Sequence, residues 1–217
     1  MLNLFEKILD LIFPPACGIC GKEINTYLCQ KCEEQINKIT CVGKDNYENK
    51  YFSSHMYLFK YDGIIRSKII SYKFDDNPYL YKTFCEIFVK NKKVCGFLQN
   101  YDIIIPVPMY RKKKNKRGYN QSELIAKEIA RRLGSIEFKN DILIKIKNTP
   151  KQSSLNKEQR MINLKNVYKV HNELFIKNKN VLIFDDIYTT GSTANECAKT
   201  LKEAGAKNIA ILTIAKD

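Results

Sequence analysis

The chain has 217 residues, of which 37 are lysine or arginine and 23 are aspartate or glutamate, so its formal net charge is +14. This length suits one α/β domain plus a small appendage, and without an apolar run of about 18 residues no transmembrane span or stable membrane insertion is expected. The positive charge alone does not identify a nucleic-acid-binding protein, because all but six of the basic residues are lysine, a bias typical of AT-rich genomes.

The first segment, Leu2 to Phe13, places its apolar residues on one helical face and is followed by Pro14 and Pro15. It lacks a basic leader and a small-residue cleavage site, so a signal peptide is not expected. The pattern predicts a short docking helix that ends at the prolines. A membrane-surface anchor is the alternative interpretation.

Two CxxC pairs separated by eight residues follow directly after this segment. Each pair can present two thiolates to one ion, and two pairs complete a tetrahedron. A segment this short cannot bury a core of its own, so bound zinc would supply most of its folding energy. The spacing therefore predicts a structural Zn²⁺ site without an open catalytic position, with the ligands Cys17, Cys20, Cys29 and Cys32.

Other uses of these cysteines remain open from the sequence. Two disulfides would be expected in a secreted protein, and a redox role is typical of a single CxxC pair. Cys41 lies close enough in the chain to replace Cys32 as a ligand. The remaining cysteines, at 85, 95 and 197, are interpreted as small core residues.

The predicted domain boundary follows the cysteines. We expect residues 1–45 to form the N-terminal helix and zinc finger, and residues 46–217 to form a larger α/β domain, with a polar connector at 41–50. Apolar patterns predict a strand and two helices at the start of that domain, at 55–61, 62–74 and 79–90.

Further strands alternate with connections along the rest of the chain. Asn120 has the features of a helix N-cap, Glu123 would complete a capping box, and Gly134 would end that helix. Strands alternating with helices predict a mostly parallel, doubly wound sheet. The expected strands lie at 103–107, 142–146, 167–170, 181–184 and 208–215.

The most informative segment is Val181 to Thr193, VLIFDDIYTTGST. A buried strand leads to two adjacent carboxylates, Asp185 and Asp186, and a turn around Gly191 leads into a helix. Ligands of open α/β sheets bind at this edge, and free amides at a helix N-terminus bind phosphate. Because glycine has no side chain, it allows close approach to a phosphate. The pattern predicts a receptor for a sugar phosphate.

These thirteen residues resemble the phosphoribosyl-pyrophosphate (PRPP) motif of type I phosphoribosyltransferases. The resemblance implies that Asp185 and Asp186 hold the ribose hydroxyls of PRPP and that Mg²⁺ bridges its pyrophosphate. It also implies that the turn wraps the 5-phosphate, through Thr189, Thr190, Gly191, Ser192 and Thr193.

A departing pyrophosphate needs cations around it, and two segments could supply them. The first, residues 106–121, follows a sheet strand, and the second, residues 149–163, is long enough to be a mobile lid. Arg117 and Arg160 are the arginine candidates for phosphate contact. Lysines 112–114 are interpreted as a solvated basic loop.

The same segments carry a narrower resemblance, to the ComF family of competence-associated, phosphoribosyltransferase-like proteins. Its features here are the paired CxxC knuckle, Pro106-Val107-Pro108 followed by RGYNQ, a T–x2–Q–x2–L–x4–R–x2–N stretch, and the PRPP motif. The resemblance implies that six further positions contact the ligand or order its loops: Arg117, Asn120, Gln121, Thr149, Gln152 and Arg160.

The family resemblance implies a cytoplasmic protein that binds PRPP and acts in DNA uptake during natural transformation, together with a competence helicase or other uptake proteins. Single-stranded DNA would follow the zinc knuckle and the basic region 111–132, with Tyr110 and Tyr119 available for base stacking. The alternative is an active housekeeping phosphoribosyltransferase that transfers phosphoribosyl from PRPP to a nucleobase or related amine.

Overall fold

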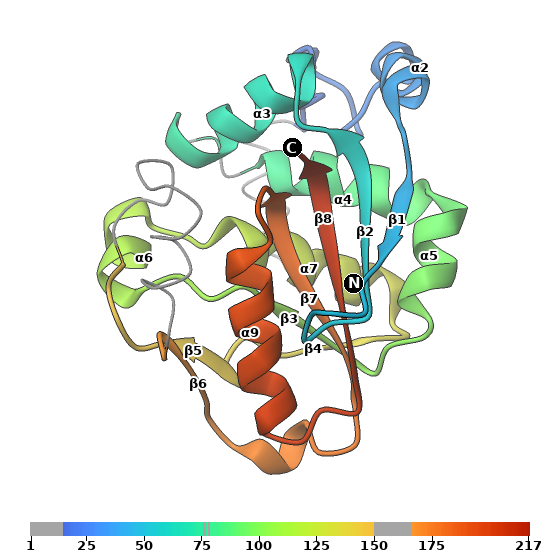
Figure 1. The fold of residues 1–217 in the computed structure, drawn as a ribbon. Coiled ribbons are helices and arrows are strands. Elements are labelled where there is room, and N and C mark those ends of the chain that lie inside the picture. The colour runs from blue at the N-terminus through green and yellow to red at the C-terminus, as the bar shows by residue number, and fades with distance from the viewer. Residues whose placement is uncertain (1–14, 76, 78, 150–165) are drawn as a thin grey trace.

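The computed structural model describes residues 15–75, 77, 79–149 and 166–217 (Figure 1). The helix predicted at residues 2–13 lies outside the described residues, as does most of the predicted lid. The described residues form an α/β fold around one large sheet.

Six strands make up the sheet, in the spatial order β1-β2-β8-β7-β3-β4. Every neighbouring pair is parallel except β1 and β2. The predicted mostly parallel sheet is therefore confirmed. The strands are β1 (Gly43–Asn46), β2 (Ser54–Lys60), β3 (Ile103–Pro106), β4 (Glu137–Phe138), β7 (Asn180–Tyr188) and β8 (Asn208–Lys216).

Helices cover both faces of this sheet, as a doubly wound fold requires (Figure 1). One face packs against α3, α4, α5 and α7, and the other packs against α9. The helices are α2 (Gln30–Ile39), α3 (Gly63–Phe74), α4 (Leu80–Lys90), α5 (Lys92–Leu98), α6 (Arg111–Arg117), α7 (Gln121–Leu133) and α9 (Ser192–Glu203), with a 3-10 turn at Glu173–Phe175.

The central strands are apolar at consecutive positions because both of their faces are buried. Side chains alternate across a strand, so Leu182 and Phe184 of β7 join one core while Val181 and Ile183 join the other. All four are fully buried. This double burial explains why an unbroken apolar run correctly predicted a strand.

Two sequence predictions about the sheet were wrong, although strands do form within the predicted ranges 142–146 and 167–170. β5 (Leu143–Lys145) and β6 (Tyr168–Val170) pair with each other as a separate antiparallel ribbon and are not part of the main sheet. Both neighbours of β3 are already taken, by β7 and β4, so the ribbon packs beside α9 instead. The second error is the predicted connector at 41–50, where β1 pairs with β2 and crosses the predicted boundary after residue 45.

The predicted capping box of α7 is only half formed. The side-chain oxygen of Asn120 accepts a hydrogen bond from the Ser122 backbone, as an N-cap does. Glu123 does not turn back toward the cap, because Lys114 and Asn140 donate to its carboxylate. The helix ends as predicted, at Gly134 in the left-handed conformation.

Candidate functional site

Asp185 and Asp186 lie on β7 at the edge of the sheet where a cleft opens. The sequence predicted that this strand ends before the two carboxylates. β7 instead continues to Tyr188, because β8 extends equally far and pairs with it. On the other side, β3 stops at Pro106. The unequal strand lengths leave a cleft of about 760 Å³ that both carboxylates line.

The side chain of Asp185 is held by neighbouring donors. Ser122 Oγ donates to its Oδ1 over 3.1 Å, and the Asp186 backbone N–H donates to the same oxygen over 2.9 Å. Burial in the cleft and the adjacent charge of Asp186 together raise the pKa of Asp185 well above its ordinary range. Ser122, at the start of α7, was not among the predicted site residues.

Lys73 is the second residue that the sequence analysis missed. Its ammonium lies 2.7 Å from Asp186 Oδ2, and it lines both the cleft and the smaller cavity beside it. Lys73 comes from the last turn of α3, far from the motif in sequence. Its position four residues after the buried Ile69 placed it on the inward face of that helix, and this spacing is the signal that could have identified it.

The turn after β7 forms the wall of a second cavity of about 180 Å³. It joins β7 to the N-terminus of α9, where the first backbone amides have no partner within the helix and can bind an anion. Gly191 adopts φ 73°, a left-handed conformation that favours glycine. Hydroxyls gather here as well, since Thr190 Oγ1 and Ser192 Oγ are 2.9 Å apart. All five predicted phosphate-loop residues, Thr189, Thr190, Gly191, Ser192 and Thr193, line this cavity.

Arg117, Asn120 and Gln121 line the main cleft together. Arg117 donates to Gln121 Oε1 over 2.7 Å, and its guanidinium lies over the Phe74 ring at 5.4 Å. Asn120 donates to the Val107 carbonyl over 3.0 Å, which ties the loop after β3 to α7. Gln121 is buried, and its amide nitrogen has no hydrogen-bond partner among the described residues. These contacts connect the end of α6 and the loop after β3 to the start of α7 along the cleft wall.

Thr149 is the meeting point of two lysines. Lys113 donates to its carbonyl over 2.8 Å, and Lys145 donates to its hydroxyl over 2.9 Å. Burial and the neighbouring charge of Lys113 lower the pKa of Lys145. Lysines 112–114 were expected to form a solvated basic loop, but they lie on the helix α6, where Lys113 is exposed and lines the cleft. The predicted residues Gln152 and Arg160 lie outside the described residues.

The two tyrosines proposed for base stacking differ in their surroundings. Tyr110 lines the cleft. Tyr119 packs against Tyr72 at 5.8 Å and donates its hydroxyl to the Tyr72 carbonyl, so its partly buried ring is held against the core. The exposed aromatic side chain of the cleft is Phe74, which is 60% exposed.

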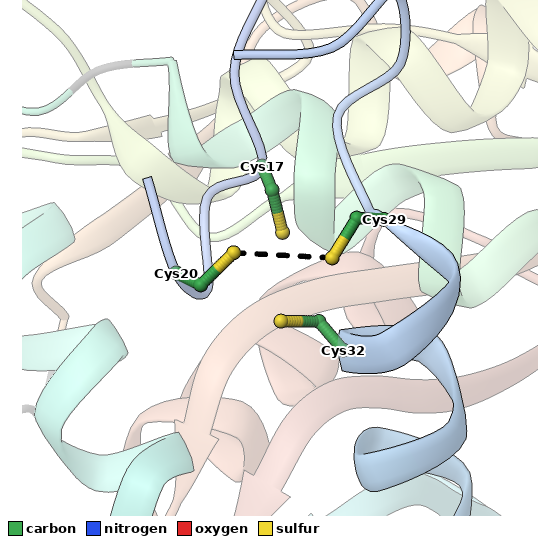
Figure 2. Close-up of side chains that lie close together, drawn as sticks. All are labelled: Cys17, Cys20, Cys29 and Cys32. Atoms are coloured by element: carbon green, nitrogen blue, oxygen red, sulfur yellow. Dashed lines mark hydrogen bonds between the residues drawn. The ribbon is translucent and has the colours of Figure 1, made fainter. Parts of the chain in front are cut away.

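The four cysteines form one cluster, in which each sulfur lies within 4.8 Å of the other three (Figure 2). Four sulfurs around an ion at about 2.3 Å would be about 3.8 Å apart. Cys20 Sγ and Cys29 Sγ are 3.8 Å apart, and all four thiols are free. Their side chains thus fit a tetrahedral ion better than two separate disulfide pairs. Cys41 is exposed and lies outside the cluster.

The cysteine cluster is anchored on α4. Cys17 and Cys20 lie in a turn, and Cys32 belongs to the first turn of α2. Thr83 donates to the Tyr27 carbonyl over 2.8 Å, and Lys82 donates to the Tyr27 hydroxyl over 2.6 Å. The cluster is therefore packed onto the larger fold. Within the part of the chain that the structure describes, none of the helices has the length and apolarity needed to cross a bilayer.

The family model for the phosphoribosyl transferase domain matches residues 120–217. Among solved structures, an adenine phosphoribosyltransferase from Trypanosoma brucei aligns with a TM-score of 0.43 and 15% identity, covering 85% of this chain and 67% of that chain.

Several proteins named for competence or DNA use are similar in sequence. Competence protein F of Haemophilus influenzae is 30% identical, over 93% of this chain and 85% of that protein. Competence protein ComFC of Bacillus subtilis is 23% identical, over 92% and 77%. The DNA utilization protein YhgH of Escherichia coli K12 is 31% identical, over 55% of this chain and about half, 51%, of its own length. The chain belongs to the ComF family of competence-associated, phosphoribosyltransferase-like proteins.

Proposed function

We propose that this protein binds PRPP and acts in DNA uptake during natural transformation. One observation carries the proposal: two carboxylates and a hydroxyl-rich loop at a helix N-terminus line the same cavity. Asp185 and Asp186 accept hydrogen bonds from the ribose hydroxyls, and residues 189–193 enclose the 5-phosphate. This pairing of acceptors and donors matches a sugar phosphate, which offers hydroxyl groups at one end and an anion at the other.

The pyrophosphate of PRPP lies in the main cleft, where Mg²⁺ accompanies it. The cations that line this cleft support the assignment, because a pyrophosphate requires positive charge around it. Lys113, Lys145 and Arg117 provide that charge, in addition to Lys73 beside the carboxylates. Thr149 holds two of these lysines in place.

The four-cysteine cluster holds one structural Zn²⁺. Four soft thiolate ligands at tetrahedral separations favour zinc, and a set of four protein ligands has no open position for catalysis. The ion stabilises residues 16–39 and their packing on α4.

Single-stranded DNA binds across the basic surface that begins at α6, whose sequence is RKKKNKR. Exposed lysines on a short helix can follow a phosphate backbone with little sequence preference. The names of the similar competence and DNA utilization proteins support a role in DNA uptake. We place the protein in the cytoplasm, with a competence helicase or other uptake proteins as partners.

The second candidate function is transfer of the phosphoribosyl group to a nucleobase or related amine. The large cleft favours it, since its volume extends beyond the sugar-phosphate site to Phe74 and Tyr61. A planar acceptor could stack there beside Arg117.

Titration of the full chain with PRPP and Mg²⁺, with and without a single-stranded oligonucleotide, tests both candidates. We expect PRPP to bind and the double variant Asp185→Asn/Asp186→Asn to lose that binding while it stays folded. Release of pyrophosphate on addition of a nucleobase would establish the transferase activity. Equal affinity of the wild type and the double variant for PRPP would refute the assigned ribose site.

A further inference from the structure

The loop between β1 and β2, residues 47–53, lies against the phosphate loop. It is closed by the Tyr47 backbone N–H, which donates to the Ser53 carbonyl over 2.9 Å. We call it the strap. Its polar sequence predicted part of a connector at 41–50, and none of the proposed functions uses it.

The strap is attached to both sides of the phosphate loop. On one side, Lys50 donates to the hydroxyl of Tyr188, the residue directly before the loop, over 2.7 Å. On the other side, the Tyr51 backbone N–H donates over 3.1 Å to the side chain of Asn195, on the first turn of α9. The segment that binds the 5-phosphate is therefore held at both of its ends by residues far away in sequence.

The ammonium of Lys50 lies close to Gly191. A Cβ atom placed on Gly191 would collide with the Tyr188 hydroxyl and lie 2.9 Å from Lys50 Nζ. The same ammonium lies over the rings of Tyr47, Phe52 and Tyr188, at 4.7, 5.4 and 5.4 Å. Aromatic rings around a cation exclude water, so its field is screened less than that of a solvated surface lysine.

Lys50 is not among the residues that line the 180 Å³ cavity. We propose that Lys50 is a positioning residue, which holds the phosphate loop in its anion-binding conformation through Tyr188 and adds positive potential close to Gly191. The proposal rests on the proposed phosphate site. The ligand of this site is a phosphomonoester, such as the 5-phosphate of a ribose, and Lys50 contributes to the affinity for it.

The test compares Lys50→Met and Lys50→Arg with Lys44→Met in full-length protein. Lys44 lies on β1 with its ammonium over the Phe97 ring, so the control removes an equal charge and a similar ring contact away from the phosphate loop. Calorimetric titration with ribose 5-phosphate, and with PRPP and Mg²⁺, gives the affinities. We expect Lys50→Met to weaken both by about five- to tenfold, Lys50→Arg to recover most of the loss, and Lys44→Met to stay within about twofold of wild type.

Two results would overturn the role of Lys50: an affinity of Lys50→Met equal to that of Lys44→Met, or an arginine variant as weak as the methionine variant. A purely structural role would lower the melting temperature of the unliganded protein and leave the affinity at low temperature unchanged. If Lys50→Met does not fold, Asn195→Ala tests the second attachment, with an expected loss of about two- to threefold. Unchanged affinity of Asn195→Ala for ribose 5-phosphate and PRPP would also contradict a role of the strap in phosphate binding. Absence of PRPP and ribose 5-phosphate binding in the wild type would instead refute the proposed function itself.

Discussion

The ammonium of Lys73 lies 2.7 Å from Asp186 Oδ2, so a helix that precedes the sugar-phosphate motif by more than a hundred residues supplies the counter-ion for its carboxylates. The pair is mostly buried, with 22% of the Lys73 side chain and 11% of the Asp186 side chain exposed. Two adjacent carboxylates in a cleft repel each other, and a nearby cation reduces that repulsion. Lys73 therefore favours the ionised form of Asp185, which is the form that the proposed ribose site requires.

Removal of the Lys73 charge should shift the pH dependence of PRPP binding. Burial and Asp186 raise the pKa of Asp185, whereas Lys73 lowers it. In Lys73→Met the pKa of Asp185 should rise further, so PRPP affinity should begin to fall at a higher pH than in wild type as the solution is acidified. Calorimetric titrations between pH 6 and 9 would measure this shift.

The surroundings of Asp185 and a control on α3 make this test specific. Among the described residues, Lys145, Tyr168 and Cys197 also interact electrostatically with Asp185. Burial keeps Tyr168 and Cys197 neutral by raising their pKa values. Lys68→Met removes the same charge from α3 at a position that does not line the cleft. If the pH at which PRPP affinity begins to fall moved equally in the Lys68 and Lys73 variants, the role of Lys73 would be contradicted.

Asp185→Asn should stabilise the unliganded protein at alkaline pH. The pKa of Asp185 is raised to about 7 in the folded state, so folding takes up a proton between the ordinary carboxyl pKa and that value. The contribution of Asp185 to stability therefore falls as pH rises through this window. Above pH 7 the folded protein bears the full cost of a buried, charged Asp185. Asparagine keeps the acceptor for Ser122 and carries no charge.

Thermal melting at pH 5 and pH 8.5 would measure the effect. We expect the variant to melt several degrees above wild type at pH 8.5, since each kcal/mol corresponds to about 2–4 °C for a chain of this size. The difference should shrink at pH 5, and PRPP binding should be weakened or lost. A melting temperature lower than wild type at pH 8.5 would show that the Asp185 carboxylate is not destabilising.

The central strands and the phosphate loop were predictable because local patterns determine them. Val181 to Phe184 form an apolar run buried on both faces, and Gly191 marks a turn that needs a left-handed residue. The cysteine spacing likewise determined which four sulfurs meet.

The missed features depend on contacts between distant segments. β1 is the polar sequence GKDN, and only its pairing with β2 makes it a strand. The short apolar runs of β5 and β6 could not show which sheet they join. Lys50 and Lys145 resemble surface lysines in the sequence. Lys50 meets Tyr188, and Lys145 joins Asp185 in the cleft lining, only when separate elements pack together.

Loss of one cysteine ligand should release zinc and loosen the N-terminal module. Cys32 is buried on α2 within the cluster, and a hydroxyl is a poor zinc ligand beside three thiolates. In Cys32→Ser we expect less than one zinc per chain by elemental analysis and faster amide exchange in residues 16–39. Cys41→Ser, outside the cluster, is the control and should keep its zinc. Full zinc content in Cys32→Ser would refute the four-cysteine site.

Neutralisation of two exposed lysines on α6 should weaken single-stranded DNA binding. Lys112 and Lys116 are exposed and do not line the main cleft. Lys112→Gln/Lys116→Gln should reduce the slope of log affinity against log salt by about 1.4, because each phosphate contact on a single strand contributes about 0.7. Fluorescence anisotropy with a labelled oligonucleotide at several salt concentrations would measure the slope, and PRPP affinity should not change.

The matched control for this surface is Lys177→Gln/Lys179→Gln. These two exposed lysines precede β7, at the opposite edge of the sheet from α6, and their loss changes the net charge equally. If both double variants lowered DNA affinity to the same extent, the binding would reflect the overall positive charge of the protein and not a surface at α6.

Gly191→Ala should weaken phosphate binding by more than its effect on the overall stability of the protein would explain. The residue has φ 73°, and a left-handed conformation costs alanine about 1–2 kcal/mol. Its new Cβ would also collide with the Tyr188 hydroxyl, which Lys50 holds in place. Gly96→Ala, on α5 with open space around its Cα, should be neutral or slightly stabilising. We therefore expect Gly191→Ala to lose measurable ribose 5-phosphate binding in calorimetry while Gly96→Ala binds as wild type does. Binding of ribose 5-phosphate by Gly191→Ala with wild-type affinity would place the phosphate elsewhere, because a loop forced away from this conformation could not keep its amides directed at the anion.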